Sequence, residues 1–346
     1  MKKRYLIAGL ATLAGVGLAY KLSRRPRDVE WTMYARVLHH PEHSWFAMID
    51  GMRVHYQDFG NEDAPPIVMI HGFIASNFVW SNVVKPIASQ GFRIIAPDLI
   101  GYGFSDKPRK FEYTIGAQAR TIVRLLDTLG IEKATLVGSS YGGATAATIA
   151  LDHPDRVERL VLVDAVINND TKNQALLRLG ASPIVGDMIS PLILDSEAIM
   201  RWRMRQFYSP VNRTIFDAER MESHYRPLRA ANTHRAIVKT LRHWHADRIE
   251  REAHRITQPT LLIWGEHDLE TPLEHGEKLH HLIPNSRLIV FRNCGHLPQE
   301  EFPGEFAELI VDFCDEQKHN EMIEQVKKQL REKVKAQIRP NELSAK

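Results

Sequence analysis

The residue pattern with the clearest chemistry is the pentapeptide Gly-Ser-Ser-Tyr-Gly at 138–142. It follows an apolar run at 134–137 and precedes a helix-like stretch rich in Ala and Thr. A G-x-S-x-G pattern between a strand and a helix is typical of a nucleophile elbow, a sharp turn that lifts the serine hydroxyl off the end of a sheet. Ser140 is therefore the predicted nucleophile. A serine alone reacts poorly, so it needs a base, an acid that orients the base, and an oxyanion site.

The predicted base is His296, in the sequence Asn-Cys-Gly-His just past the last apolar run. The chain has 17 histidines, and position selects this one, because it follows both the last predicted strand and an acidic residue. That acid is Asp268, directly after the preceding strand. A carboxylate there accepts the imidazole N–H, fixes its tautomer and stabilises the imidazolium. Glu266 and Asp164 remain alternatives for the acid.

The predicted oxyanion site consists of backbone N–H groups. Donors already aimed at the developing negative charge lower the barrier to attack on a carbonyl. Tyr141, the residue after the nucleophile, supplies one donor. The loop after the apolar run at 66–71 supplies the other, most simply through Phe73. His71 is interpreted as a hydrogen-bonded brace for this loop rather than as a base.

These residues need a scaffold, and the apolar pattern predicts one. Short runs without charges alternate with helix-type periodicity, as at 117–129, which favours a mostly parallel sheet covered on both faces. A Gly after Asp50 predicts a turn between two N-terminal strands, at 46–49 and 53–57. The later strands are predicted at 66–71, 92–97, 134–137, 159–164, 260–264 and 287–291.

The alternation stops between residues 165 and 255, where the periodicity is helical. An insertion between two parallel strands should form a cap over their carboxyl ends, the side on which open α/β sheets bind ligands. Its apolar residues are expected either to line an acyl tunnel or to pack the cap's own core. They are Leu176, Leu179, Ile184, Met188, Ile189, Leu192, Ile193 and Leu194.

Composition narrows the class of protein. The chain has 346 residues, 44% of them hydrophobic and 25% charged, which suits a globular protein with a full core. A net charge of +3, without a basic face interleaved with aromatics, argues against nucleic acid as a partner. The two cysteines, Cys294 and Cys314, make no disulfide framework and have no metal-type spacing.

The sequences at the two ends of the chain suggest that the protein associates with a membrane. Residues 1–25 combine basic flanks with a short apolar stretch, which predicts an uncleaved N-terminal anchor or, alternatively, a cleaved export signal. Residues 26–44 are expected to form a linker. Residues 316–346 predict a charged helix with a thin apolar stripe, suited either to an anionic membrane surface or to docking on protein. The expected localisation is therefore membrane-associated.

Taken in order, the motifs resemble the α/β-hydrolase superfamily, in particular its branch with a helical cap between the sixth and seventh strands. The resemblance implies a core at 45–164 and 256–315 and a cap at 165–255. Carried over residue by residue, the superfamily's triad falls on Ser140, Asp268 and His296, and no metal or organic cofactor is implied. Besides the elbow, the motifs are His71-Gly72, residues 97–108, residues 163–165, residues 265–268 and Gly295-His296.

Three functions follow from this resemblance. Members of the branch that open epoxides or displace halide carry aspartate at the nucleophile position, so Ser140 favours acyl chemistry. The first hypothesis is a serine esterase acting on hydrophobic esters such as acylglycerols, because the N-terminal segment is similar to that of membrane-bound monoacylglycerol-lipase-like members. The second is a C–C bond or small-ester hydrolase with the same triad. The third is a ligand-binding protein without catalysis.

Overall fold

A computed structural model describes residues 39–170 and 193–315, together with residues 15, 180–182, 186 and 190. The described residues form one sheet of eight strands in the order β1-β2-β4-β3-β5-β6-β7-β8. From β4 onward in this order, each neighbouring pair is parallel. The strands are β1 (Ser44–Ile49), β2 (Met52–Phe59), β3 (Pro66–Ile70), β4 (Arg93–Pro97), β5 (Ala134–Ser139), β6 (Val157–Val163), β7 (Thr260–Gly265) and β8 (Ser286–Phe291).

The N-terminal hairpin forms as the turn chemistry predicts. β1 and β2 pair in antiparallel fashion, and Ile49 lies opposite Met52. The two turn residues, Asp50 and Gly51, both have positive φ (51° and 76°), which is the geometry an Asp-Gly hairpin turn requires. β1 begins at Ser44, the last residue of the predicted linker.

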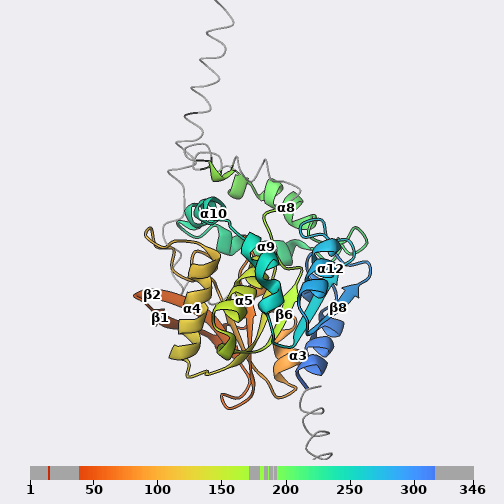
Figure 1. The fold of residues 1–346 in the computed structure, drawn as a ribbon. Helices are drawn as coiled ribbons and strands as arrows, with labels where there is room; N and C mark the ends of the chain where they lie inside the picture. The colour runs from red at the N-terminus through yellow and green to blue at the C-terminus, as the bar shows by residue number, and fades with distance from the viewer. Residues whose placement is uncertain are drawn as a thin grey trace, which may run out of the picture.

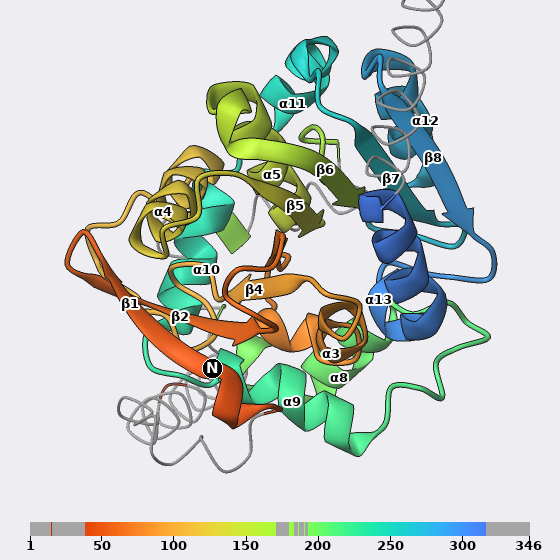
Figure 2. The same cartoon turned by 90° about the horizontal axis from the view of Figure 1, so that it is seen from below.

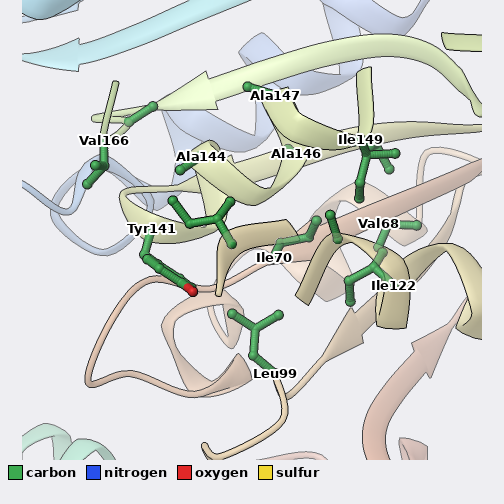
Figure 3. Close-up of a cluster of buried hydrophobic side chains, with 14 of the residues drawn as sticks. Val68, Ile70, Leu99, Ile122, Tyr141, Ala144, Ala146, Ala147, Ile149 and Val166 are labelled. Atoms are coloured by element: carbon green, nitrogen blue, oxygen red, sulfur yellow. The ribbon is translucent and has the colours of Figure 1, made fainter. Parts of the chain in front are cut away.

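Helices cover both faces of the sheet (Figure 2). One face carries α4 (Ile115–Thr128), α5 (Tyr141–Asp152) and α12 (Leu273–Leu282), whose apolar residues join one buried cluster. Figure 3 shows part of this cluster, in which Tyr141 and Ala144 of α5 lie near Ile70 and Leu99. The other face carries α3 (Val84–Ala88) and a helix over 303–315, which form a second cluster.

The described residues between β6 and β7 contain helices, in the stretch for which the sequence predicts a helical cap. The described part contains α8 (Glu197–Arg205), α9 (Ala218–Leu228), α10 (Thr233–Arg242) and α11 (Asp247–Glu252). α8 and α10 lie over one end of the sheet (Figure 1). α11 instead packs against α5 of the core, and the N–H of Glu250 donates to the carbonyl of Ile167. Other short helices among the described residues are η1 (Pro41–His43), η2 (Asn77–Trp80), η3 (Pro154–Arg156), η4 (Ala253–Arg255) and α13 (Pro298–Glu301).

Several predictions fall on other parts of the chain. The N-terminal segment at 1–25, apart from residue 15, lies outside the described residues, as do most of the linker and the C-terminal segment at 316–346. Within the part of the chain that the structure describes, no helix combines the length and apolar character needed to cross a membrane. The anchor and the basic C-terminal helix therefore stay predictions.

Candidate active site

Ser140 occupies a strained turn between β5 and α5. Its φ of 54° and ψ of −117° are rare for a residue with a side chain, and such strain persists only where the surroundings impose it. Here the backbone imposes it. The N–H of Ser140 donates to the carbonyl of Val163 at 2.9 Å, and its carbonyl accepts from the N–H of Val166 at 3.0 Å. The end of β6 thus holds the elbow in place.

The glycines of the elbow allow backbones to approach closely. A Cβ built on Gly142 would lie 2.1 Å from the carbonyl oxygen of Ile70, and one on Gly138 would lie 2.3 Å from that of Gly142. Both distances are far below van der Waals contact. In the sheet, Gly138 pairs with Ile70 of β3 and with Leu162 of β6, so the elbow sits at the centre of the sheet.

The predicted base and acid meet in the structure. Nδ1 of His296 lies 2.8 Å from Oδ2 of Asp268, and both side chains are buried. The acid is itself held by the chain that follows it. Thr271 donates its hydroxyl to Oδ2 at 2.7 Å, and the N–H of Glu270 donates to Oδ1 at 2.7 Å. The sequence analysis missed Thr271, although an Asp followed three residues later by Thr is a common local turn pattern.

The electrostatics of this pair suit a base and its orienting acid. Burial acts to raise the pKa of Asp268, but His296 and Thr271 outweigh it, so the pKa is lowered and the carboxylate stays ionised. Burial acts to lower the pKa of His296, and the charge of Asp268 outweighs it, so that pKa is raised. Because Nδ1 faces the carboxylate, Nε2 is the nitrogen left to accept the serine proton.

The first alternative acid, Asp164, has a different role. It is fully buried, and its Oδ1 accepts the N–H of Gly265 at 2.8 Å. Burial and the neighbouring Asp268 raise the pKa of Asp164 well above its ordinary value, because a second negative charge beside Asp268 is unfavourable. Among the described residues, one group has ligand atoms close enough for a metal ion: Asp164, Asp268 and His296, within 4.8 Å of one another. The bond between His296 and Asp268 already uses the ligand atoms of two of its members.

The second alternative acid, Glu266, binds a different part of the chain. Its carboxylate accepts the N–H of Asn293 at 2.9 Å and so fastens the loop that precedes His296. The structure therefore brings only one of the three acids, Asp268, into a hydrogen bond with the base.

The oxyanion loop lies directly against the nucleophile. A Cβ built on Gly72 would stand 3.1 Å from Cβ of Ser140, and Phe73 lines the same cavity as Ser140. Tyr141 is the first residue of α5, so its N–H has no acceptor within the helix. The positions of both predicted donors are thus compatible with an oxyanion site.

His71 braces this loop, as expected. Its Nδ1 donates to the carbonyl of Gly72 at 2.8 Å, and its Nε2 accepts the N–H of Leu99 at 3.0 Å. Burial lowers the pKa of His71, which agrees with a neutral ring.

The sequence analysis missed the role of Asp98. Its carboxylate forms a hydrogen bond with Nδ1 of His55 at 2.7 Å and accepts the N–H of Asn77 at 2.8 Å. Burial acts to raise the pKa of Asp98, but His55 outweighs it and the pKa falls to about 2.

A cavity of about 440 Å³ lies above the elbow, with Ser140 and His296 both on its wall. Its size is within the range of small-molecule sites. Of the eight cap residues predicted as possible lining, Ile193 and Leu194 line it, and the other six lie outside the described residues. Most of the described lining is apolar and comes from both cap and core; it includes Phe73, Val166, Met200, Met204, Phe207, Leu241, Trp244 and Leu297.

The mouth of the cavity is also apolar. Ile199 and Trp202 of α8 line it from the cap and Leu269 lines it from the core, and these three side chains are respectively 44%, 64% and 50% exposed. Large exposed hydrophobic groups gathered at a cavity entrance are typical of a surface that meets apolar ligands.

A nucleophilic serine at this kind of turn is suited to acyl transfer, so the fold and the site together define the class of serine hydrolases. A family model described as "alpha/beta hydrolase fold" matches residues 65–303. The chain belongs to this α/β-hydrolase family, and the predicted fold class is confirmed.

Named relatives refine the comparison. The chain is 32% identical over 271 residues to the uncharacterised hydrolase YugF of Bacillus subtilis, covering 77% of this chain and 95% of that protein. It is 29% identical to the 2-hydroxy-6-oxo-2,4-heptadienoate hydrolase of Pseudomonas putida, covering 76% and 93% of the two chains. The meta-cleavage product hydrolase of Pseudomonas fluorescens has a TM-score of 0.67 at 26% identity and covers 79% and 98%.

These relatives indicate which of the functions expected from the sequence has more support. Hydrolases of dienoates and of meta-cleavage products stand among the named matches, which agrees with the second hypothesis better than with a monoacylglycerol-lipase-like protein. The broader prediction, a hydrolase with an α/β-hydrolase fold, is confirmed.

Proposed function

We propose that this protein hydrolyses carboxylic esters with an apolar acyl group, which sits in the cavity above Ser140. The observation that carries the proposal is the lining itself: most of the described wall around the candidate triad is aliphatic or aromatic. An acyl chain that enters it leaves water without losing hydrogen bonds, which is favourable by about 25 cal/mol for each Å² of apolar surface buried.

In the proposed reaction, Oγ of Ser140 attacks the ester carbonyl while Nε2 of His296 takes the serine proton. The N–H groups of Phe73 and Tyr141 stabilise the oxyanion. His296 then gives its proton to the leaving alcohol, and an acyl-enzyme remains on Ser140. Water, activated by His296, attacks this acyl-enzyme and releases the acid. Asp268 keeps the imidazole in the tautomer that both steps need.

A second candidate function is hydrolysis of a C–C bond next to a ketone. Two observations favour it: characterised relatives are named as dienoate and meta-cleavage product hydrolases, and Arg203 of the cap lines the cavity. The relatives support this candidate more directly than the ester, whereas the apolar lining supports the ester. The two reactions use the same nucleophile and base, so they differ in the group that leaves.

Two finer proposals accompany the ester function. Acylglycerols are one class of ester with an apolar acyl group, and the N-terminal segment at 1–25 is proposed to anchor the enzyme at a membrane that holds them. Both are supported by the sequence pattern at the N-terminus and by the exposed apolar side chains at the cavity mouth.

One set of assays separates the candidates. Purified enzyme is given p-nitrophenyl esters of increasing acyl length and, in parallel, a 2-hydroxy-6-oxo-2,4-dienoate, with Ser140→Ala as the control for both. The proposal predicts ester turnover that rises with chain length and disappears in the variant. Faster cleavage of the dienoate than of every ester would replace the ester proposal by the second candidate, and no Ser140-dependent turnover of either would refute both.

A further inference from the structure

An arginine and a glutamate on the described part of the cavity wall form an ion pair beside the candidate triad. Arg203 of α8 and Glu270 of the loop after β7 bind each other through two hydrogen bonds, at 2.7 and 2.5 Å. Both residues line the cavity, and among its described lining they are the only Lys, Arg, Asp or Glu. The pair therefore brings the net charge of these side chains to zero.

The surroundings hold the pair in place. The guanidinium of Arg203 lies 4.8 Å from the ring centre of Phe207, which in turn lies 5.6 Å from the ring of His296. Glu270 is fixed through its backbone, because its N–H donates to Asp268. The side chains of Arg203 and Glu270 are 34% and 23% exposed, so the pair is partly shielded from water.

This arrangement affects any substrate with a carboxylate. Such a group leaves water on entering an apolar cavity and must find a charged partner to offset that loss. The two carboxylate oxygens of Glu270 already accept hydrogen bonds from the guanidinium of Arg203, in the bidentate geometry that carboxylates prefer. An entering carboxylate would meet a cation that is engaged and an anion that repels it.

We propose that the Arg203–Glu270 pair sets the charge selectivity of the cavity: Glu270 neutralises Arg203, so the enzyme favours uncharged acyl compounds over carboxylate-bearing ones of equal length. The inference rests on the proposed hydrolysis at Ser140 and adds the class of substrate to it. A direct consequence is that Arg203, once freed from Glu270, becomes a binding site for a substrate carboxylate.

The test compares matched substrates. p-Nitrophenyl hexanoate and mono-p-nitrophenyl adipate have the same acyl length and differ by a terminal carboxylate. A second pair carries the carboxylate on the leaving group instead: the hexanoyl esters of methyl 4-hydroxybenzoate and of 4-hydroxybenzoate. The readout is the ratio of kcat/KM for the anionic and the neutral ester. Effects of a variant on the triad act on both esters and cancel in this ratio.

Glu270→Gln is expected to raise the ratio on the order of tenfold in at least one substrate pair, because a charge-assisted hydrogen bond becomes available to the substrate. Arg203→Gln is expected to lower it, and the double variant to restore it close to the wild-type value. The matched control is Glu274→Gln, which removes the same charge from an exposed position on α12 outside the lining. We expect this variant to leave both ratios unchanged.

Unchanged ratios in Glu270→Gln for both substrate pairs would overturn the proposal, and so would an equal change in Glu274→Gln. A binding experiment keeps the inference separate from the hydrolysis on which it rests. In the Ser140→Ala background, calorimetry gives the Kd of hexanoate and of hexanamide. Adding Glu270→Gln is expected to tighten binding of hexanoate relative to hexanamide. If no variant cleaves any ester, the proposed function fails, and this Kd ratio still decides the role of the pair.

Discussion

The floor and the roof of the cavity are built in different ways. The floor, around Ser140, is held by backbone hydrogen bonds to Val163 and Val166 and by glycines that leave no room for a side chain. The roof, around α8, meets the cavity through side chains such as Met200 and Arg203. The comparison suggests that the geometry of the nucleophile is set by the main chain, whereas substrate choice is set by exchangeable side chains.

The base is held by both regions. The N–H of His296 donates to the carbonyl of Phe207, which belongs to the cap insertion, at 2.6 Å. Glu300, just after the base, extends this attachment. Glu300 accepts the hydroxyl of Tyr208 at 2.6 Å and pairs with Arg220, both of them cap residues. Displacement of the cap would therefore disturb the base before it disturbed the nucleophile.

The largest loss of activity is expected from substitution of Asp268, the acid that orients the base. Asp268→Asn should lower kcat by about 10³- to 10⁴-fold, because the amide favours the wrong tautomer of His296. It should also move the acidic limb of the pH–rate profile to lower pH. In the wild type the raised pKa of His296 puts that limb above the ordinary value of about 6.5, since only the neutral ring accepts the serine proton. Steady-state kinetics at several pH values provides the measurement.

Asp164→Asn is the control for this prediction. Because burial and Asp268 raise the pKa of Asp164 and so favour its neutral form, an amide of the same shape should lower kcat by less than about tenfold. Equal losses in the two variants would show that the two carboxyls share the role assigned to Asp268.

The second effect concerns the floor. Gly142→Ala places a Cβ 2.1 Å from the carbonyl oxygen of Ile70, and the backbone of β3 has no room to yield at the centre of the sheet. We expect the free energy of unfolding in urea to fall by about 3 kcal/mol or more. Gly116→Ala, in α4, meets only the far end of Arg120 at 3.6 Å and should be neutral or stabilising by about 0.5–1 kcal/mol. Similar stabilities for the two variants would contradict a floor held by close backbone contacts.

The third effect is on stability and concerns Glu300, which attaches the roof to the loop that carries the base. Burial acts to raise the pKa of Glu300, but His224 and Arg220 outweigh it and lower that pKa from 4.5 to about 2. A carboxylate with a lowered pKa stabilises the folded state fully at pH values above its pKa in the unfolded chain, which is near 4.5. This stabilisation is lost as the pH falls toward 2, the pKa in the folded state. Its size is on the order of 3 kcal/mol. Urea unfolding of Glu300→Gln should therefore show a lower stability at pH 7 and a weaker acid dependence than the wild type. The exposed Glu305→Gln should match the wild type.

The smallest effect is expected at the mouth. Trp202→Ala removes a side chain that is 64% exposed, so stability should change by no more than about 0.5 kcal/mol. The KM for a long-chain ester should rise about three- to tenfold, since apolar contact area is lost on the path to Ser140. Trp45→Ala removes a tryptophan of similar exposure (56%) from β1, outside the cavity lining, and should leave the KM unchanged. Equal KM values for the two variants would show that the mouth takes no part in binding.

The same division between floor and roof explains what the sequence could predict. The elbow, the acid and the base lie at strand ends, and strand order is readable from apolar runs, so Ser140, Asp268 and His296 could be selected before the structure was known. Strand limits were less accurate: β6 begins at Val157, two residues before the predicted start, because Glu158 interrupts its apolar pattern.

The roof could not be predicted in this way. The partners Arg203 and Glu270 are 67 residues apart, and nothing in either local sequence indicates the other. The same holds for Tyr208 and Glu300, which are 92 residues apart. Such contacts depend on how the inserted helices dock on the core, and helical periodicity does not specify that docking.

The most direct test of the account is covalent labelling of the intact enzyme with a fluorophosphonate, followed by mass spectrometry of its peptides. We predict one adduct for each chain, on Ser140, with labelling slowed strongly in Asp268→Asn and His296→Ala and abolished in Ser140→Ala. An adduct on another residue, or equal labelling of Ser140→Ala, would contradict the assignment of the nucleophile.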